Sequence, residues 1–470
     1  MPHSQTTRTR LSATALLAAL ALAGCGSDGP RGRPTGGQAA TGTGGDRPSF
    51  GTVQPAALSA GEHDRLLSAA FDGANRLYAA GWVATGDDQA MAVSRFGLDG
   101  GLDQTFGDKG VATANVAVGG KAVELARSVV VQASGKIVVA GPVEHDPSAT
   151  GDAAKDTDVA LVRFDQDGRL DASFGSGGIV RLDLSTGVAE GTAYRADTSW
   201  GLIEVAGDKL LLVAGQVAPG RSDLDFAVVR LTADGATDPS FGAGGVSLVG
   251  AAPGASDVPK TAVELPDGRV VVTGYASVAG TVQTVLFRLA PDGALDPTFG
   301  TDGVSVQALL GNVTEAYAVE VLGNGRLVTT GYGKDSADAK VDLIIGGFTP
   351  DGAVDRAHGD NGVVRIDLAG EDDRGRSLVG LPGGGALVVG SGKATESNLD
   401  GLVVRIDGSG ALDEAFGTSG RRLYDLGGPN DSFFGVAVSP DRSRVAVVGY
   451  VGQATNGSEK DDGAVLWLEP

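Results

Sequence analysis

The sequence predicts an all-β fold: a ring of seven four-stranded antiparallel blades in which the N-terminal strand closes the last blade. Three observations lead to this prediction. A unit of four short strands recurs along the chain, two marker positions occur seven times each, and the two ends of the chain are complementary pieces of one unit. A closed ring of this kind is a seven-bladed β-propeller.

The clearest copy of the repeat lies within residues 257–306. It has four apolar runs, and an Asp267-Gly268 turn joins the first two. The runs are Thr261–Leu265, Arg269–Gly274, Thr284–Leu289 and Val304–Val306. Alternation with period two, β-branched residues and Asp-Gly turns are signals of strands and hairpins. Each unit is therefore expected to form four short antiparallel strands.

Two marker positions fix the number of units. A Phe-Gly step precedes each fourth strand, with one degenerate copy, and a glycine closes each second strand. The steps begin at Phe50, Phe106, Phe174, Phe241, Phe299, His358 and Phe416, and the glycines are Gly81, Gly141, Gly215, Gly274, Gly331, Gly390 and Gly449. Most spacings fall between 56 and 60 residues, and the longer ones indicate loop insertions, the largest near 143–157.

The two ends of the chain decide between a ring and an open array. The last unit, Asp431–Pro470, stops after three strands, whereas the N-terminal region supplies a Phe-Gly step at Phe50 and one strand after it. We therefore expect Thr52–Ala57 to pair with Ala464–Leu468. Closure of this kind removes the open sheet edges, while an open solenoid would need capping repeats at both ends.

The first 47 residues are set apart from the fold. Arg8 and Arg10 precede an apolar run at Leu11–Leu22, and Leu22-Ala23-Gly24-Cys25 resembles a bacterial lipobox. We expect residues 1–24 to be a lipoprotein signal peptide, Cys25 to be lipidated, 25–47 to be a flexible Gly/Pro/Thr-rich tether and 48–470 to be the propeller. The alternative is an ordinary secretory peptide with an incidental cysteine.

Composition limits the partners of the mature chain. Loss of Arg8 and Arg10 with the signal peptide changes the formal charge from −21 to −23. A strongly acidic chain is a poor partner for nucleic acid or for anionic lipid headgroups, so the lipid is the expected membrane contact. With glycine at position 26, outer-membrane delivery is expected rather than inner-membrane retention. One cysteine in 470 residues allows no internal disulfide, and a monomer is expected.

Two acidic series recur at fixed places in the repeat. One stands ten residues before each first turn, and the other stands before each third strand. The first comprises Glu62, Glu124, Asp197, Asp257, Asp373 and Asp431, with Thr314 in the remaining copy, and the second comprises Asp158, Asp225, Asp342, Asp400 and Asp462. Both series are expected on one face. They either satisfy loop N–H groups and keep the protein soluble, or form a site for a divalent cation such as Ca²⁺, which needs six to eight oxygen ligands, or for a cationic partner.

Aromatic residues end several second strands on the same side: Trp82, Tyr275, Tyr332 and Tyr450. They indicate either packing at blade edges or a surface that stacks on a sugar or peptide. No catalytic constellation is visible, since the mature chain has three histidines at unrelated repeat positions (His63, His145 and His358) and lacks a Gly-x-Ser-x-Gly motif. We therefore predict no enzyme activity.

Two runs carry a family resemblance: Asp267–Gly274 (DGRVVVTG) and the repeated LDxxFGxxG pattern. They resemble the delta-60 repeat, a propeller-type repeat of unknown function in secreted and lipid-anchored bacterial proteins. The resemblance covers essentially 48–470 and implies a fold and a compartment but no catalytic residues. Two hypotheses for function follow: a lipid-anchored scaffold that binds an envelope protein, or a carbohydrate- or cation-dependent ligand-binding propeller, with action on polysaccharide included.

Overall fold

The computed structural model describes residues 50–56, 58–59, 63–86, 88–119, 123–190, 193–252, 254–393, 398–452 and 460–470. Residues Gly45–Pro470 form one compact unit. The expected signal peptide, Cys25 and the tether lie outside the described residues. Within the described part of the chain, no helix has the length and apolar character needed to cross a bilayer.

The described residues form antiparallel meanders of four short strands. Asp-Gly and related turns join successive strands, as period-two alternation predicted. The first three meanders are β2 (Asp64–Phe71), β3 (Leu77–Thr85), β4 (Asp88–Phe96) and β5 (Val111–Ala114); β6 (Ser128–Val131), β7 (Ile137–Glu144), β8 (Thr157–Phe164) and β9 (Ile179–Leu182); and β12 (Thr198–Val205), β13 (Lys209–Val217), β14 (Leu224–Leu231) and β15 (Val246–Val249).

The next three meanders continue the same pattern. They are β16 (Asp257–Glu264), β17 (Val270–Val278), β18 (Thr281–Leu289) and β19 (Val304–Gln307); β20 (Val313–Val321), β21 (Leu327–Lys334), β22 (Asp342–Phe348) and β23 (Val363–Ile366); and β24 (Arg374–Gly380), β25 (Ala386–Gly392), β26 (Asp400–Ile406) and β27 (Arg421–Tyr424). A single parallel bridge, Val282 to Val313, joins the first two of these into one eight-stranded sheet.

The remaining sheet joins the two ends of the described chain. It has the order β1 (Val53–Pro55), β30 (Asp462–Leu468), β29 (Val445–Val451) and β28 (Ser432–Val438). Val53 pairs with Leu466 and Pro55 with Ala464. The predicted pairing of the N-terminal strand with the last strand is therefore confirmed.

Two insertions lengthen the loops, as the irregular repeat spacing indicated. A 3₁₀ helix at Gly151–Lys155 lies between β7 and β8, and a hairpin of β10 (Val188–Glu190) and β11 (Ala193–Arg195) lies between β9 and β12. Both are additions to a meander, and neither interrupts a four-stranded ladder.

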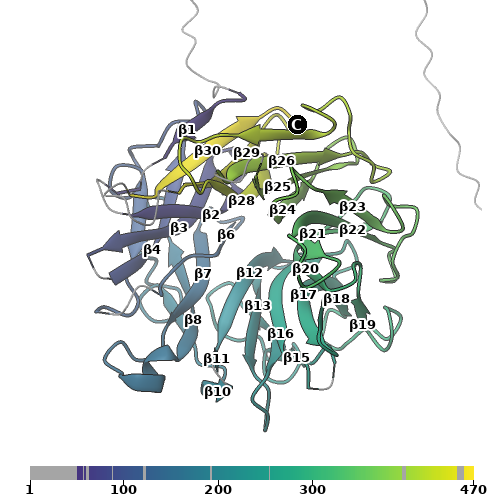
Figure 1. Ribbon diagram of the computed structural model, residues 1–470. Coiled ribbons are helices and arrows are strands. Elements are labelled where there is room, and N and C mark those ends of the chain that lie inside the picture. Colours follow the sequence, from purple (N-terminus) through teal and green to yellow (C-terminus); the bar gives the residue numbers. More distant parts are fainter. Residues whose placement is uncertain are drawn as a thin grey trace, which may run out of the picture. The chain divides into compact units, whose positions relative to one another are not determined.

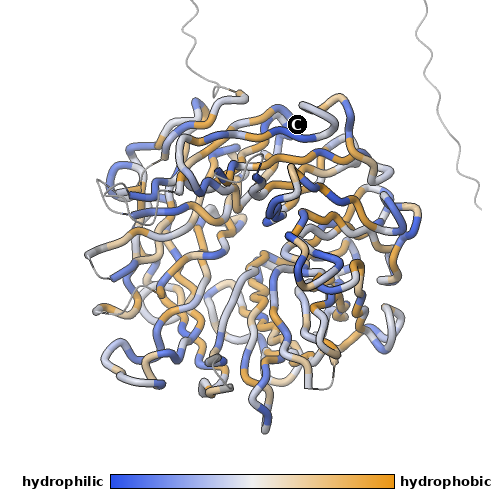
Figure 2. Tube along the Cα trace, viewed as in Figure 1, coloured by the Kyte–Doolittle hydropathy of each residue, from blue (hydrophilic) through white to orange (hydrophobic). Residues whose placement is uncertain are grey.

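The first strands of the meanders lie nearest a common centre (Figure 1). Each contacts the first strand of the next meander, in the circuit β2, β6, β12, β16, β20, β24, β28 and back to β2. Apolar side chains fill the space between neighbouring sheets, and one buried cluster joins Leu66 and Phe96 to Val465 and Trp467 across the junction of first and last sheets. Figure 2 shows the apolar residues concentrated along the strands. This arrangement is a β-propeller.

The Phe-Gly step forms the junction between neighbouring sheets. The Phe299 ring lies against Gly352 of the next meander, where an added Cβ would come within 2.6 Å of it. The Arg288 guanidinium bonds Asp296 at 2.8 Å, reaches the Pro350 carbonyl at 2.7 Å and lies 4.9 Å from the Phe299 ring centre. The arginine therefore pairs with the aspartate of its own Phe-Gly turn and also ties its sheet to the next.

The innermost strands carry a recurrent β-bulge. In β2, β12, β16, β20, β24 and β28 the ladder register shifts near the start of the strand. The recurrent glycine, which was expected to close each second strand, instead lies within that strand and beside this bulge; β3, for example, continues past Gly81 to Thr85. At Gly81 an added Cβ would lie 1.8 Å from the Arg65 carbonyl oxygen, and at Gly331 it would lie 1.8 Å from that of Glu315. The close approach of the two backbones explains why glycine recurs at this position.

Candidate functional site

The acidic residues that begin the first strands are buried. Asp431, for example, accepts hydrogen bonds from the backbone N–H groups of Leu426 (2.8 Å), Gly428 (3.2 Å) and Gly452 (3.1 Å). Glu124, Asp197, Asp257 and Asp373 likewise accept backbone N–H groups of the loop that enters their strand, and all five are 0% exposed. The structure therefore places them inside the junctions between sheets, not on an exposed acidic face.

The first copy of this series is displaced by two residues from the sequence-based position. Glu62 lies outside the described residues, and Asp64 makes the equivalent contacts, with bonds from the N–H groups of Leu58, Ser59 and Gly463. Asp72-Gly73 is not the tip of the turn after β2: the Asn75 N–H bonds the Asp72 carbonyl, as the Gly268 N–H bonds the Leu265 carbonyl, so the tip lies two residues later and counting back from Asp72-Gly73 gives Glu62. Counting back from the recurrent glycine, Gly81, gives Asp64.

Burial changes the acidity of this series. Removal from water raises the pKa of Asp64, Asp197 and Asp431 to about 6 and the pKa of Glu124, Asp257 and Asp373 to about 7, against the lowering effect of the N–H donors. These carboxyl groups titrate at weakly acidic to neutral pH, whereas ordinary surface carboxylates titrate at lower pH.

The second acidic series lies beside the first at several junctions. Oxygens of Asp342 and Asp373 lie within 4.8 Å of one another and of Asp367, and Asp400, Asp425 and Asp431 form the same arrangement at the next junction. Most of these oxygens already have partners: Asp342 pairs with Arg365, and Asp373 accepts the N–H groups of Leu368 and Lys393.

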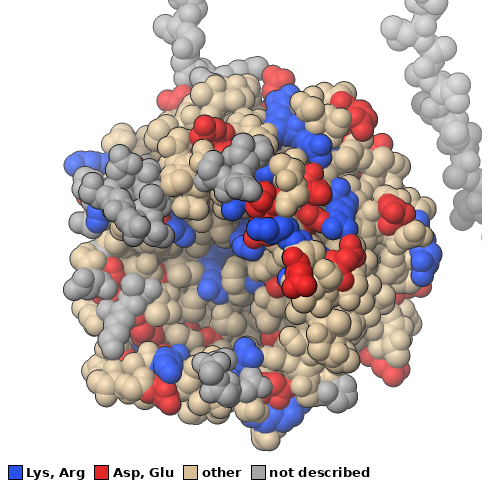
Figure 3. Space-filling model, viewed as in Figure 1, with Lys and Arg blue, Asp and Glu red and all other residues tan. Residues whose placement is uncertain are grey.

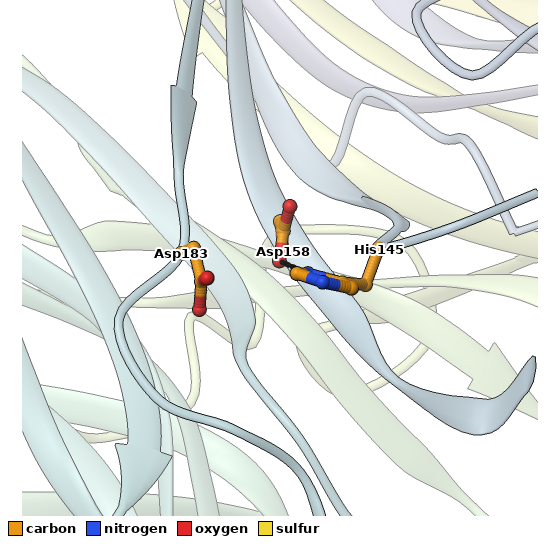
Figure 4. A group of neighbouring side chains, drawn as sticks. All are labelled: His145, Asp158 and Asp183. Carbon is orange, nitrogen blue, oxygen red and sulfur yellow. Dashed lines mark hydrogen bonds and ion pairs between the residues drawn. The ribbon is translucent and has the colours of Figure 1, made fainter. Parts of the chain in front are cut away.

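The remaining members of the second series have different surroundings. Asp225 pairs with Arg221, and Asp462 begins the last strand. Asp158 bonds His145 at 2.8 Å and also pairs with Arg181, with Asp183 beside it (Figure 4). A carboxylate already paired with an arginine is a poor ligand for a metal ion, so this group does not by itself indicate a metal centre.

The four aromatic residues expected to end second strands lie within β3, β17, β21 and β29, each directly after the recurrent glycine. Tyr275 stacks on Tyr317 with ring centres 6.2 Å apart, and Tyr332 lies 5.5 Å from the same ring. Tyr450 lies 5.6 Å from Phe434, and Trp82 lines the central cavity. The aromatic partners of Tyr275, Tyr332 and Tyr450 come from first strands.

The innermost side chains form a ring that sequence analysis missed. We call it the channel ring, and each member stands three residues after the first acidic position or its threonine equivalent. Its members are Leu67, Arg127, Trp200, Lys260, Tyr317, Arg376 and Phe434. Except for Arg127, which directly precedes β6, each falls at the bulge, where it is skipped by the ladder. A bulge re-aims the side chain of the extra residue, here toward the centre of the molecule.

Cations and aromatic rings alternate around the channel ring. The Arg127 guanidinium lies 4.0 Å from the Trp200 ring centre, and the Lys260 ammonium lies 3.3 Å from the same ring and 4.0 Å from Tyr317. Arg376 lies 5.1 Å from Tyr317 and 5.0 Å from Phe434. These are cation–π distances, so each ring holds cationic groups in place.

The channel ring lines a central cavity of about 770 Å³. This size lies within the range of small-molecule sites. Figure 3 shows basic side chains inside the hollow at the centre of the face. Glu204, Glu264 and Glu320 also line the cavity, near the other ends of the first strands, and each accepts a backbone N–H group of a neighbouring sheet. The cavity is therefore basic at the channel ring and acidic farther along.

Two of the three channel-ring cations have lowered pKa values. Lys260 is 2% exposed, and its burial, together with the charge of Arg127, lowers its pKa well below the usual value. Burial also lowers the pKa of Arg127 to about 10. In the described part of the chain, none of the three pairs with a carboxylate within ion-pair distance, whereas Arg65 nearby is bonded by Asp461. The ring therefore holds basic groups that lack an acidic partner.

The three histidines of the expected mature chain lie in different parts of the ring of sheets. His63 accepts the Asp461 N–H, His145 bonds Asp158, and His358 is buried without a hydrogen bond to either ring nitrogen. They do not meet at the central cavity, whose lining contains none of them.

Comparisons with known proteins agree with this fold. Residues 132–174, 208–241 and 265–299 match a β-propeller family described as a domain of unknown function (DUF5122). The polysaccharide lyase Uly1 is 12% identical with a TM-score of 0.50, and the match covers 86% of this chain and 89% of that one. Virginiamycin B lyase from Staphylococcus aureus, solved with quinupristin, is 10% identical with a TM-score of 0.47, and the match covers 88% of this chain and 99% of that one.

Comparison with curated proteins gave no match in sequence. At such low identities a structural likeness bears on fold alone. The recurrent four-stranded sheets, their closed circuit of contacts and the matched segments agree, and the chain is similar to the DUF5122 β-propellers in three of its repeats.

Proposed function

We propose that this chain is a seven-bladed β-propeller that acts as a non-catalytic binding module of the bacterial cell envelope, with its ligand in the central cavity. The blade count is supported by five separate four-stranded sheets together with the two four-stranded halves of the eight-stranded sheet. The N-terminal strand β1 completes the last blade.

One observation supports the choice of site. In six first strands the pairing with the second strand is interrupted at the same place, and the residue left out of the ladder points its side chain into the cavity. Interrupting a ladder leaves a residue out of regular pairing, and bulges are frequent beside functional sites. Five of these six side chains are cationic or aromatic, Leu67 being the exception, and together with Arg127 they line a cavity of about 770 Å³. A ligand-binding role explains both features, whereas a scaffold acting only through its outer surface explains neither.

The binding role is tested by measuring thermal unfolding of the protein with soluble fragments of envelope saccharides, neutral and acidic. A ligand of the cavity should raise the unfolding midpoint of the native protein and leave that of Trp200→Leu unchanged, because Trp200 holds both Arg127 and Lys260. If crosslinking in intact envelopes captures a membrane protein equally with the native protein and with Trp200→Leu, the scaffold role on the outer surface is the better account.

Attachment by lipid is the second part of the proposal. It is supported by the lipobox-like Leu22-Ala23-Gly24-Cys25 and by the acidic charge of the chain, which disfavours direct adsorption to anionic headgroups. Cys25→Ala should release the protein into the soluble fraction. Persistent sedimentation of this variant with outer membranes would refute the anchor.

A further inference from the structure

Basic side chains buried without acidic partners are costly. A charged lysine in a low-dielectric site either loses its proton or requires a counter-ion. Lys260 is 2% exposed, lies on β16 and is enclosed by Trp200 of β12 and Tyr317 of β20. Arg127 and Arg376 lie on the far sides of the same two rings, so three basic groups share one wall of the cavity.

The acidic groups near this wall do not neutralise it. Glu315, on β20, is the carboxylate whose charge acts on Lys260, yet it forms no ion pair with Lys260 within 4.0 Å in the described structure, and its Oε2 is buried without a hydrogen bond. Tyr275, on β17, also faces Lys260, with its ring centre 5.4 Å from Nζ. Arg127 and Arg376 both disfavour the charged lysine. In the described structure, therefore, no carboxylate neutralises the basic groups of this wall.

We propose that the channel ring seats an acidic ligand, whose carboxylate, sulfate or phosphate group lies among Lys260, Arg127 and Arg376, and that Lys260 takes up a proton from solvent when this ligand binds. This inference rests on the proposed cavity site and specifies the chemistry of its ligand. Arginine and lysine bind such anions through charge-assisted hydrogen bonds, which strengthen in a site of low dielectric constant.

The volume of the cavity indicates an organic ligand. About 770 Å³ is far more than one inorganic anion fills, so the anionic group is expected to be part of a larger molecule. The more distant part of the cavity is lined by Glu204, Glu264 and Glu320, whose carboxylate oxygens can accept hydrogen bonds from hydroxyl groups. An acidic sugar with its carboxylate at the channel ring and its hydroxyls toward the glutamates fits this polarity.

Calorimetry with trigalacturonate, inorganic phosphate and neutral galactotriose tests the proposal. Binding is measured at pH 6 and pH 8, in two phosphate-free buffers of different ionisation enthalpy. Trigalacturonate should bind more tightly at pH 6, and the buffer dependence of the heat should show net proton uptake. Inorganic phosphate should bind more weakly, which separates the anionic contact from contacts to the sugar.

The variants assign the effect to one residue. Lys260→Met should weaken trigalacturonate binding about 10- to 100-fold, as expected for loss of one hydrogen bond from a charged group, and should abolish proton uptake. Lys155→Met, which removes an equal charge from an exposed loop, should change neither quantity. Because Met retains the apolar contacts with Trp200, circular dichroism and the unfolding midpoint should show a folded protein.

The outcomes separate the two proposals. Equal binding of trigalacturonate and galactotriose, lost in Trp200→Leu, would support the cavity site and overturn the anion inference. If trigalacturonate binds without proton uptake, or if Lys260→Met leaves its binding unchanged, the role of Lys260 is overturned. Failure of both anions to bind at millimolar concentration would overturn the anion inference. If saccharide fragments also bind equally to native protein and Trp200→Leu, the cavity site itself is refuted.

Discussion

Replacing His358 with phenylalanine should stabilise the protein. His358 stands where the other described copies of this turn have phenylalanine, and its side chain is 0% exposed with neither ring nitrogen hydrogen-bonded. In the neighbouring junction Phe299 occupies the same place against Gly352, as His358 does against Gly410. The phenylalanine ring therefore has a matching position in the same fold.

The magnitude follows from the two unsatisfied nitrogen atoms. A buried polar group without a partner costs about 1–3 kcal/mol, and phenylalanine removes that cost while adding apolar contacts. Gly347, whose added Cβ would lie close to the imidazole ring, leaves room for a larger ring in this junction. We expect the free energy of unfolding of His358→Phe to rise by about 1–3 kcal/mol at pH 7.5.

The advantage of the phenylalanine should grow in acid. Burial and the charge of Arg326 lower the pKa of His358 in the folded protein, while an unfolded histidine titrates near 6.5. At this residue the unfolded state therefore binds more protons, so the contribution of His358 to stability falls as pH drops below about 6.5. The Phe variant does not have this loss.

Urea unfolding of both proteins, followed by tryptophan fluorescence at pH 7.5 and pH 5.5, measures the effect. The expected result is a stabilised variant whose difference from the native protein increases at pH 5.5. His358→Leu serves as a control that removes the nitrogen atoms but fills the junction less well. A destabilised Phe variant, or a difference that shrinks at pH 5.5, would refute the assignment of His358 as an unsatisfied neutral side chain.

Three further predictions concern stability. The buried acidic series has raised pKa values near 6 to 7, so at these groups the native state binds more protons than the unfolded state. The unfolding midpoint should therefore rise as pH falls from 7.5 to 5. A midpoint that falls instead would show that these groups are ionised throughout this range. Gly352→Ala should lower stability by about 2 kcal/mol or more, because φ is +86° and the Cβ would meet the Phe299 ring, whereas Gly383→Ala, with open space around it, serves as a milder control in scanning calorimetry. If the acidic clusters hold Ca²⁺, calcium should raise the midpoint and chelator lower it; an unchanged midpoint would remove the cation from consideration.

The strand order and the closure of the ring could be predicted from the sequence, because turns and tight contacts have few residue choices. Asp-Gly turns and glycines such as Gly331 are required by local geometry, so their positions fix the strands between them. The N-terminal strand was found by counting pieces of a repeat. The first acidic series was also located, except for the copy at Asp64, where Asp72-Gly73 precedes the tip of the turn by two residues and shifted the count.

The environment of these residues was less predictable. A carboxylate that meets backbone N–H groups looks the same in sequence as one that faces water, so the burial of Asp373 and its equivalents could not be read from spacing. The channel ring was missed because a bulge disrupts period-two alternation. Alternation predicts which face of the sheet a side chain points to, and this prediction fails where Trp200 and Tyr317 leave the ladder. Counting three residues forward from each acidic position would have shown the alternation of cations and aromatic rings.

Most strand positions must both pair with a neighbouring strand and present a side chain. The repeated bulge assigns these two roles to different residues. A residue that is skipped by the ladder, as Phe434 is, contributes little to strand pairing, while its neighbours Phe433 and Gly435 pair with Gly449 and Val448. The scaffold therefore presents a circle of interchangeable side chains on a framework whose folding depends on other positions. Grafting a different combination at these places, for instance acidic residues for basic ones, is a direct route to propellers with new ligand preferences.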